Sequence, residues 1–311
     1  MEFFRKTTKI DFLGARFIAA WFSGLMVAAA IASLGVRGLN FGIDFTGGTL
    51  LEAGYANPVD LNGVRSQLQA SEFRGAVVQY YGTAQDVLIR LAPRVDLNSA
   101  EVSNRMLELL GSGANPVEMR RVEFVGSQVG EELAEEGGLA MIIALFGILV
   151  YVSLRFQMRF SVGAIVALAH DTIITIGFFS VTGMDFDLSV LAAILAVIGY
   201  SLNDTIVVFD RVRENFRRMR SAGPVEVFNA SLNQTLSRTI MTGLTTLLVL
   251  AALFVWGGEI IHGFSVALIV GIIVGTYSSV YVASPVAIAL GVSRKDLLPV
   301  EKEGDRVPNR P

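Results

Sequence analysis

Six long apolar segments constrain the fold of this chain more than any other feature of its sequence. They cover residues 17–34, 138–154, 161–181, 188–209, 240–255 and 264–290. Most of them approach the roughly 20 residues that a helix needs to cross the hydrocarbon core of a bilayer. Of the 311 residues, 52% are hydrophobic and only 17% are charged, a balance typical of a polytopic membrane protein. We therefore expect six transmembrane helices.

Composition also excludes several classes of protein. The net charge of −3 argues against a nucleic-acid-binding protein, which would present a basic surface. The chain has no cysteine, so disulfides, thiolate chemistry and cysteine-based metal sites are excluded. Its two histidines, His170 and His262, are too few for a histidine-built metal site. We expect neither a metal nor an organic cofactor.

The first apolar segment has two interpretations. Basic residues precede it, and Ala30-Ile31-Ala32 within it resembles the cleavage site of a secretory signal. The apolar core of a signal peptide is usually about 7–15 residues long, which is shorter than this segment. We therefore expect a retained first helix, and a cleaved signal is the alternative.

Basic residues in the short connections predict the orientation. Cytoplasmic loops of membrane proteins carry an excess of Lys and Arg. The third and fifth connections carry neither, whereas the second connection, the fourth connection and the segment after the last helix are basic. The basic residues are Arg155, Arg159, Arg211, Arg213, Arg217, Arg218, Arg220, Arg294 and Lys295. Both termini are therefore predicted to be cytoplasmic, and the long connection between the first two helices to be periplasmic if the cell is bacterial.

That long connection, residues 36–137, is predicted to form a small α+β domain. Strand patterns occur at residues 49–55, 76–81, 86–92 and 117–125, and helical patterns at 61–68 and 102–110. Their order, βαββαβ, is that of the ferredoxin-like split motif. The domain has eight arginines, fourteen acidic residues and no histidine, which favours a binding or coupling module over an enzyme. Residues 1–35 would hold the cytoplasmic N-terminus and the first helix, 138–292 helices two to six, and 293–311 a cytoplasmic tail.

Two of the apolar segments contain a carboxylate. Asn203-Asp204 lies in the fourth segment and His170-Asp171 near the middle of the third. A charged side chain at such a depth costs roughly 2.5–3.5 kcal/mol on insertion scales, and intramembrane acids therefore usually mark a transport pathway. The alternative for His170 and Asp171 is packing, through hydrogen bonds to a neighbouring serine or threonine.

The fifth segment supplies a counter-charge for Asp204. Polar residues recur there at spacings of three and four and form one stripe on a helix: Thr235, Arg238, Thr242 and Thr245 or Thr246. Arg238 lies near the cytoplasmic start of its helix, and Asp204 lies in the cytoplasmic half of its own. We therefore predict an ion pair between the two. In the alternative, Arg238 extends to the lipid head groups.

Four motifs, spread over nearly the whole chain, point to one family. They are FGIDFTGGTLLE at residues 41–52, ALAHDT at 167–172, GYSLNDTIVVFDRVREN at 199–215 and SRTIMTGLTTLL at 237–248. With six helices and a far-side domain between the first two, the chain resembles the SecF members of the SecD/SecF family of protein-export proteins. That family is similar in architecture to the resistance-nodulation-division transporters.

The resemblance implies a role, partners and site residues. SecF proteins pair with SecD in the bacterial inner membrane and assemble with the SecYEG channel, often with YajC and YidC. They are understood to be non-enzymatic and to use the proton-motive force, with protons as the coupling ion, to promote late steps of polypeptide translocation. In the family the NDT aspartate and the SRT arginine, here Asp204 and Arg238, line the proton path. Asp171 follows less directly, and its neighbourhood and the polar stripe add the relay candidates His170, Asn203 and Thr242.

The predicted mechanism is a charge switch. Asp204 would be ionised while it is paired with Arg238 and neutral once a proton arrives, so that one group of helices rocks against another. Two other classes remain as alternatives. A proton-coupled small-molecule exporter would use the same charges, and an intramembrane aspartyl protease would use Asp171 and Asp204 as a pair that shares a proton. The protease is disfavoured because the chain has GYSLND where such enzymes have GxGD.

Six helices with one far-side domain also look like half of a pseudo-symmetric transporter, so an obligate membrane partner is expected. The sixth segment carries a seam of small residues on one face, which suits close helix packing. The seam consists of Gly271, Gly275 and Ser278 or Ser279. We predict this seam as one candidate contact with the partner.

Overall fold

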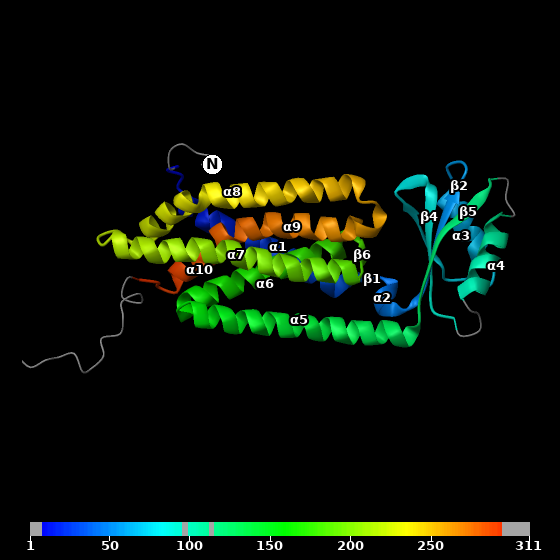
Figure 1. Ribbon diagram of the computed structural model, residues 1–311, viewed down its shortest axis with the longest axis horizontal. Coiled ribbons are helices and arrows are strands. Elements are labelled where there is room, and N and C mark those ends of the chain that lie inside the picture. Colours follow the sequence, from blue (N-terminus) through cyan, green and yellow to red (C-terminus); the bar gives the residue numbers. More distant parts are fainter. Residues whose placement is uncertain (1–7, 95–98, 112–114, 294–311) are drawn as a thin grey trace, which may run out of the picture.

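The computed structural model describes residues 8–94, 99–111 and 115–293, and the predicted tail at 293–311 lies almost wholly outside these residues. The described chain forms a bundle of long helices with a small sheet domain at one end (Figure 1). Helix α5, which follows the sheet domain in the sequence, runs back along the bundle from the same end.

Six helices in the described chain are long and apolar enough to cross a membrane, as the sequence predicted. A 3₁₀ turn, η1 (Leu13–Ala15), leads into the first, and a second 3₁₀ turn, η2 (Glu259–Ile261), precedes the last. The last helix passes through a π-helical turn, η3 (Ser279–Ala283), into α10 (Ser284–Ala289). The long helices are α1 (Arg16–Arg37), α5 (Ser127–Arg155), α6 (Met158–Thr182), α7 (Leu188–Arg218), α8 (Pro224–Trp256) and α9 (His262–Ser278).

Two of these helices begin well before the apolar runs that predicted them. Helix α5 begins at Ser127 rather than at residue 138, and α8 begins at Pro224 rather than at residue 240. Hydropathy marks only the part of a helix that faces hydrocarbon, whereas backbone hydrogen bonding continues into the aqueous zone. Local signals account for the two starts. Pro224 suits the first turn of a helix, and Gly130 packs against Gly47 so closely that a Cβ would lie 2.6 Å from the Gly47 nitrogen.

Helix α7 lies at the centre of the bundle and packs against α6, α8 and α9. The small residues of α9 allow this close approach. A Cβ added at Gly271 would lie 2.2 Å from Val197 of α7, and one added at Gly275 would lie 2.9 Å from Ser201. The small-residue seam of α9 is therefore buried against α7 of the same chain. The expectation that it contacts a separate partner is wrong, because α7 occupies the space beside the glycines.

The sheet domain has the predicted βαββαβ order. Its four strands form an antiparallel sheet in the order β3-β4-β2-β5, and its core contains Leu51, Ile89 and Met106, which are fully buried. Asp60 caps the first helix by accepting a hydrogen bond from the Asn62 nitrogen. The elements are β2 (Gly48–Tyr55), α3 (Leu61–Gln69), β3 (Val77–Tyr81), β4 (Thr83–Leu91), α4 (Ser99–Gly111) and β5 (Val117–Val125).

Three short elements that the sequence did not predict join the sheet domain to the bundle. Strand β1 (Asn40–Phe41) follows α1 and pairs in parallel with β6 (Asp185–Phe186), which lies between α6 and α7. The short helix α2 (Ile43–Thr46) then packs against α5. The linker after the first helix is thus fixed to the α6–α7 turn before the chain enters the sheet.

Candidate functional site

Asp204 projects from α7 into a contact between three helices. Thr239 of α8 donates its hydroxyl to Asp204 Oδ1 at 2.6 Å, and Ser279 donates to Oδ2 at 2.7 Å. Only 9% of the Asp204 surface is exposed. Both carboxylate oxygens therefore have a hydroxyl donor, and each donor comes from a different helix.

Asp171 is buried more deeply, with 1% of its surface exposed. Its Oδ2 accepts hydrogen bonds from Ser201 of α7 at 2.5 Å and from Ser278 of α9 at 2.7 Å. Its Oδ1 lies 2.9 Å from Nδ1 of His170. Ser201 precedes Asp204 by three residues, so the two carboxylates occupy successive layers separated by about one turn of α7, roughly 5 Å along its axis.

The last helix connects these layers through two consecutive residues. Ser278 ends α9 and binds Asp171, and Ser279 begins the π-helical turn and binds Asp204. Single π turns are rare and often occur at functional sites. Ser284 donates its hydroxyl to the Ser279 carbonyl at 3.0 Å, which gives that oxygen a partner within the widened turn. The irregular turn therefore coincides with the link between the two acids.

His170 attaches α1 to this network. Its ring stacks on Tyr277, with ring centroids 6.1 Å apart. The Tyr277 hydroxyl donates to the Ala19 carbonyl of α1 at 3.0 Å and lies 3.0 Å from the Ser23 hydroxyl. His170 Nε2 is buried and has no hydrogen-bond partner in the part of the chain that the structure describes. The histidine thus contacts the site through one ring nitrogen only.

The structure brings only some of the predicted relay residues together. Asp204, Asp171 and His170 converge, whereas Arg238, Asn203 and Thr242 are exposed on the outer surface of α7 and α8. No ion pair joins Asp204 to Arg238 among the described residues. The predicted pair is not formed in this structure because α8 turns the next residue, Thr239, towards α7, although Arg238 lies close enough for its charge to act on the Asp204 carboxylate.

Four hydroxyl residues of the site were not predicted as site residues. The sequence could have indicated them, because serine and threonine side chains often form the polar contacts between packed helices in membrane bundles. Thr239 directly follows Arg238 in the sequence, and two of the others lie on the helix that carries the small-residue seam. The four are Ser201, Thr239, Ser278 and Ser279.

A second polar constellation lies where the sheet domain meets the bundle, and Asp185 is its centre. Arg90 of β4 forms an ion pair with Asp185, and Asn40 of β1 donates to Asp185 Oδ1 at 2.5 Å. Gln79 of β3 donates to Oδ2 at 3.5 Å. Arg90 also donates to the carbonyl of Phe41 at 3.1 Å. Side chains from two strands of the sheet are thus fixed to the turn that connects α6 to α7.

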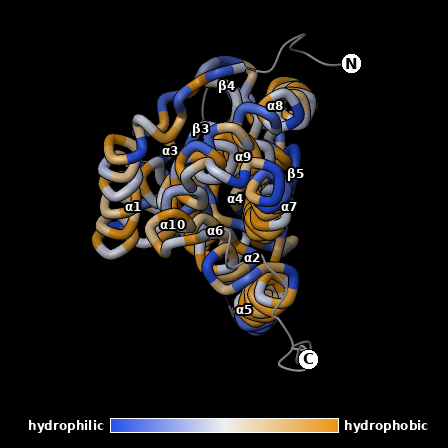
Figure 2. The backbone as a smooth tube through the Cα atoms, turned by 90° about the vertical axis from the view of Figure 1, so that its left-hand side faces the viewer, coloured by the Kyte–Doolittle hydropathy of each residue, from blue (hydrophilic) through white to orange (hydrophobic). Residues whose placement is uncertain are grey.

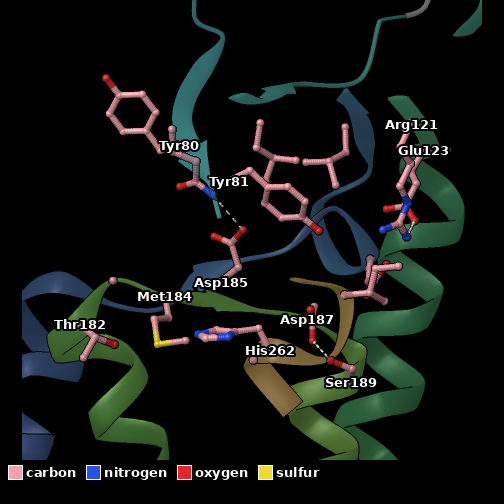
Figure 3. A pocket seen from close by; sticks show the side chains of 17 residues that line it. Tyr80, Tyr81, Arg121, Glu123, Thr182, Met184, Asp185, Asp187, Ser189 and His262 are labelled. Carbon is pink, nitrogen blue, oxygen red and sulfur yellow. Dashed lines mark hydrogen bonds and ion pairs between the residues drawn. The ribbon is translucent and has the colours of Figure 1, made fainter. Parts of the chain in front are cut away.

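We call this contact between the sheet domain and the bundle, centred on Asp185, the joint. A cavity of about 520 Å³ borders it. Figure 3 shows Tyr80 and Tyr81 on its sheet side and Asp187, Ser189 and His262 on its bundle side. Its carboxylates have intramolecular roles. Asp187 caps α7 by accepting a hydrogen bond from the Val190 nitrogen at 2.8 Å. It also accepts a hydrogen bond from the Ser189 hydroxyl at 2.7 Å, and Figure 3 marks this bond with a dashed line. Across the described ranges, no three His, Asp or Glu side chains are placed to hold a metal ion.

The motif FGIDFTGG forms the other half of the joint. Asp44 accepts a hydrogen bond from the Leu188 nitrogen, the first residue of α7, at 3.0 Å. Gly47 and Gly48 have φ angles of +67° and +128°, and a Cβ on Gly48 would lie 2.3 Å from the Leu91 carbonyl oxygen. Both positions require glycine. The motif therefore places an acid on the start of the helix that carries Asp204.

Comparison with known proteins identifies the family. The description "Protein export membrane protein SecD/SecF, C-terminal" matches residues 107–293, and "SecD/SecF GG Motif" matches residues 32–59. The chain belongs to the SecD/SecF family. The first match contains the two buried carboxylates of the helical bundle, Asp171 and Asp204, and the second contains Asp44 and the two glycines of the joint.

Relatives within the SecD/SecF family match almost the full chain. The protein translocase subunit SecF of Vibrio alginolyticus is 52% identical over 298 residues, which cover 95% of each chain. That of Pseudomonas aeruginosa is 50% identical and covers 98% of this chain and 99% of its own. The crystal structure of SecDF from Thermus thermophilus, a translocon-associated membrane protein, is 37% identical with a TM-score of 0.83. That match covers 91% of this chain but 39% of the SecDF chain, which is therefore much longer.

Proposed function

We propose that this chain is the SecF-type subunit that couples proton movement to a late step of polypeptide export. The observation that carries the proposal is the pair of buried carboxylates, Asp171 and Asp204, which accept hydrogen bonds from the consecutive residues Ser278 and Ser279. A change in the protonation of either acid therefore acts on the same short turn of the last helix. Family membership supports the assignment to export, and the carboxylate pair supports proton coupling.

The proposed mechanism couples the protonation of two layers of the bundle. Asp171 belongs to the layer nearer the sheet domain, and Asp204 to the layer farther from it. Protonation of Asp171 changes its hydrogen bond with Ser278, and the next residue, Ser279, transmits that change to Asp204. The membrane potential contributes about 2.3 kcal/mol per charge for each 100 mV crossed, which is enough to bias a two-state arrangement of helices.

Protonation of Asp204 changes its bonds to two helices. An ionised carboxylate accepts hydrogen bonds at both oxygens, here from Thr239 and from Ser279. A protonated acid becomes a donor at one oxygen, so one of the two hydroxyls loses its acceptor and must rotate. The contact that weakens is either that between α7 and α8 or that between α7 and the π-helical turn. This change is the switch that we assign to Asp204.

An obligate partner, SecD, covers the exposed polar face of α7 and α8. Asn203, Arg238 and Thr242 lie at the depth of the membrane and face outwards. Polar side chains at this depth rarely face lipid and instead face protein or a water-filled cavity. In the assembled pair, the guanidinium of Arg238 takes part in the proton path from the SecD side of the contact. The larger assembly then joins the SecYEG channel together with YajC and YidC.

The joint at Asp185 transmits the movement. The turn that carries Asp185 connects α6, which holds Asp171, to α7, which holds Asp204. Arg90, Asn40 and Gln79 attach that turn to the sheet domain. A shift of α7 against α6 therefore displaces the sheet domain, which acts on the polypeptide in the periplasm. The chain lies in the bacterial inner membrane with both termini in the cytoplasm, and protons are the coupling ion.

Gradient-dependent export in membrane vesicles that contain the chain with SecD and the channel tests the proposal. We expect Asp204→Asn to export a secreted polypeptide at the rate seen without a proton gradient. Asp210→Asn is the matched control, because Asp210 is on the same helix, is partly exposed and pairs with Arg155 at the surface. That control should keep the full response to the gradient. A full response in Asp204→Asn would exclude the proposed role.

A further inference from the structure

An apolar groove of about 510 Å³ lies on the outer surface of the bundle, between α1 and the end of the last helix. Arg16, Ala20 and Ser23 line it from α1, and Tyr281, Pro285 and Ala289 line it from η3 and α10. Small side chains at Ala20 and Ala289 leave the space between the two helices open. The groove thus exists because both of its walls carry an alanine where a larger side chain would fill it.

The position of the groove fits one leaflet of a bilayer. From Arg16 to Ser23, α1 rises about 10 Å, whereas one leaflet contributes roughly half of the 30 Å hydrocarbon core. Arg16 begins α1 at the end of the bundle that is remote from the sheet domain (Figure 1). The groove therefore runs from the interfacial zone into the hydrocarbon, in the direction that an acyl chain takes.

Arg16 is the only charged residue that lines the groove, and within the described ranges it forms no ion pair. Its guanidinium lies 4.9 Å from the centre of the Phe17 ring, so an adjacent aromatic side chain supports it without neutralising it. At the deep end, the Ser23 hydroxyl is already bonded to Tyr277. The groove thus presents one free cation at its mouth and apolar walls below it.

We propose that this groove binds an anionic phospholipid, with the phosphate on Arg16 and one acyl chain between α1 and α10. A single cation above an apolar slot matches the charge pattern of such a lipid. A protein partner is less suitable, because the exposed polar residues that need protein cover lie on α7 and α8. Figure 2 shows α1 on one side of the bundle and α7 and α8 on the other. The proposal requires only that the bundle lies in a membrane.

Native mass spectrometry of the full chain, purified with its partner in a mild detergent, tests the site with two defined lipids. Phosphatidylglycerol and phosphatidylcholine are added in turn, and the bound lipids are counted. We expect one retained phosphatidylglycerol that is lost in the double variant Ala20→Leu with Ala289→Leu, which fills the groove. In Arg16→Gln, we expect the preference for phosphatidylglycerol over phosphatidylcholine to fall about fivefold, the effect of one basic residue near a lipid surface.

Two matched variants distinguish a site from general contact with lipid. Ala29→Leu adds the same bulk to an exposed position of α1 outside the groove. Arg217→Gln removes an exposed charge at the same end of the bundle. Both should retain the lipid and its headgroup preference. Equal lipid counts and equal preferences in all variants would overturn the proposal, as would loss of the lipid in the controls as well. Arg16→Gln keeps the test decisive if the double variant is not stable.

Discussion

Ser278 and Ser279 are neighbours in the sequence, yet their hydroxyls bind carboxylates on two different helices. Ser278 donates to Asp171 of α6 and Ser279 to Asp204 of α7, both at 2.7 Å. The side chains of consecutive residues in an α-helix point about 100° apart. Ser278 and Ser279 can therefore bind different carboxylates because the last helix packs between α6 and α7. The π-helical turn begins at this point. A change at either acid therefore acts on the same short segment of the last helix.

Removal of the Ser279 hydroxyl tests this link. In Ser279→Ala, Asp204 keeps the hydrogen bond from Thr239, and the π-helical turn loses its hydrogen bond with that acid. A hydrogen bond to a charged group contributes roughly 1.5–3 kcal/mol, and each 1.4 kcal/mol of barrier is about tenfold in rate. We expect gradient-driven export to slow about tenfold or more. The measurement is the export rate in vesicles with and without the gradient.

Ser265 provides a control on the same helix. Its hydroxyl is fully buried but has no hydrogen-bond partner among the described residues. Ser265→Ala therefore removes a buried oxygen without breaking a bond and should leave export unchanged. Equal losses in Ser265→Ala and Ser279→Ala would show that the last helix tolerates no loss of a hydroxyl, and the specific link would be unsupported.

The ion pair of Arg90 with Asp185 predicts a mechanical phenotype. In Arg90→Gln, the sheet domain loses its charged contact with the α6–α7 turn, whereas the carboxylates in the bundle keep all their hydrogen bonds. We expect faster proteolysis in the linkers around the sheet domain and a lower rate of gradient-driven export. The thermal unfolding of the helical bundle should change little. Limited proteolysis and the vesicle assay measure the two effects separately.

A charge exchange checks the geometry of this pair. Asp185→Arg alone should disrupt the joint, and its combination with Arg90→Asp should restore part of the export rate. Arg105→Gln removes a surface pair with Glu72 in the same domain, and exposed pairs contribute only about 0–1 kcal/mol. This control should behave like the unmodified chain. No rescue by the exchange, together with losses in the control, would contradict a specific joint.

Much of this architecture follows from patterns that act over short distances. The six spans follow from hydropathy, and the βαββαβ order follows from local periodicity, because each needs only neighbouring residues. Asp171 and Asp204 were identifiable because a carboxylate in an apolar helix is costly wherever the helix packs. The partners of these acids were not predictable, since they depend on which face α8 and α9 turn towards α7. A rotation of α8 by about 100° about its axis is enough to place Thr239 instead of Arg238 against α7.

The joint between the sheet domain and the bundle could not be predicted from the sequence either. Strands β1 and β6 have two residues each, too few for periodicity, and they pair across more than a hundred positions. Asp185 looked like an ordinary acid in a short loop, although it joins the sheet to the bundle. Similarly, the glycines of α9 predicted close packing correctly, but composition does not distinguish a helix of the same chain from one of a partner.

Two glycine positions separate internal packing from the partner surface. Gly271→Ala inserts a methyl group against Val197, and overpacking of this kind costs about 1–3 kcal/mol. We expect a lower thermal unfolding midpoint of the purified chain. Gly199 on α7 has no atom within 4 Å of an added Cβ. Gly199→Leu should therefore leave the midpoint of the isolated chain unchanged and reduce the amount of SecD that purifies with it. Unchanged recovery of SecD would place the partner on another face.

His170 provides the last prediction, which separates proton transfer from positioning. The ring binds Asp171 through Nδ1, whereas its buried Nε2 has no partner within the described structure from which to take a proton or to which to give one. We therefore expect His170 to position Asp171 rather than to carry protons. The amide nitrogen of an asparagine can replace Nδ1 without a titrating ring. His170→Asn should keep most gradient-driven export and an unchanged pH profile, whereas His170→Ala should lose both the bond and the stacking on Tyr277. A shifted pH profile in His170→Asn would instead show that the histidine itself titrates during transport.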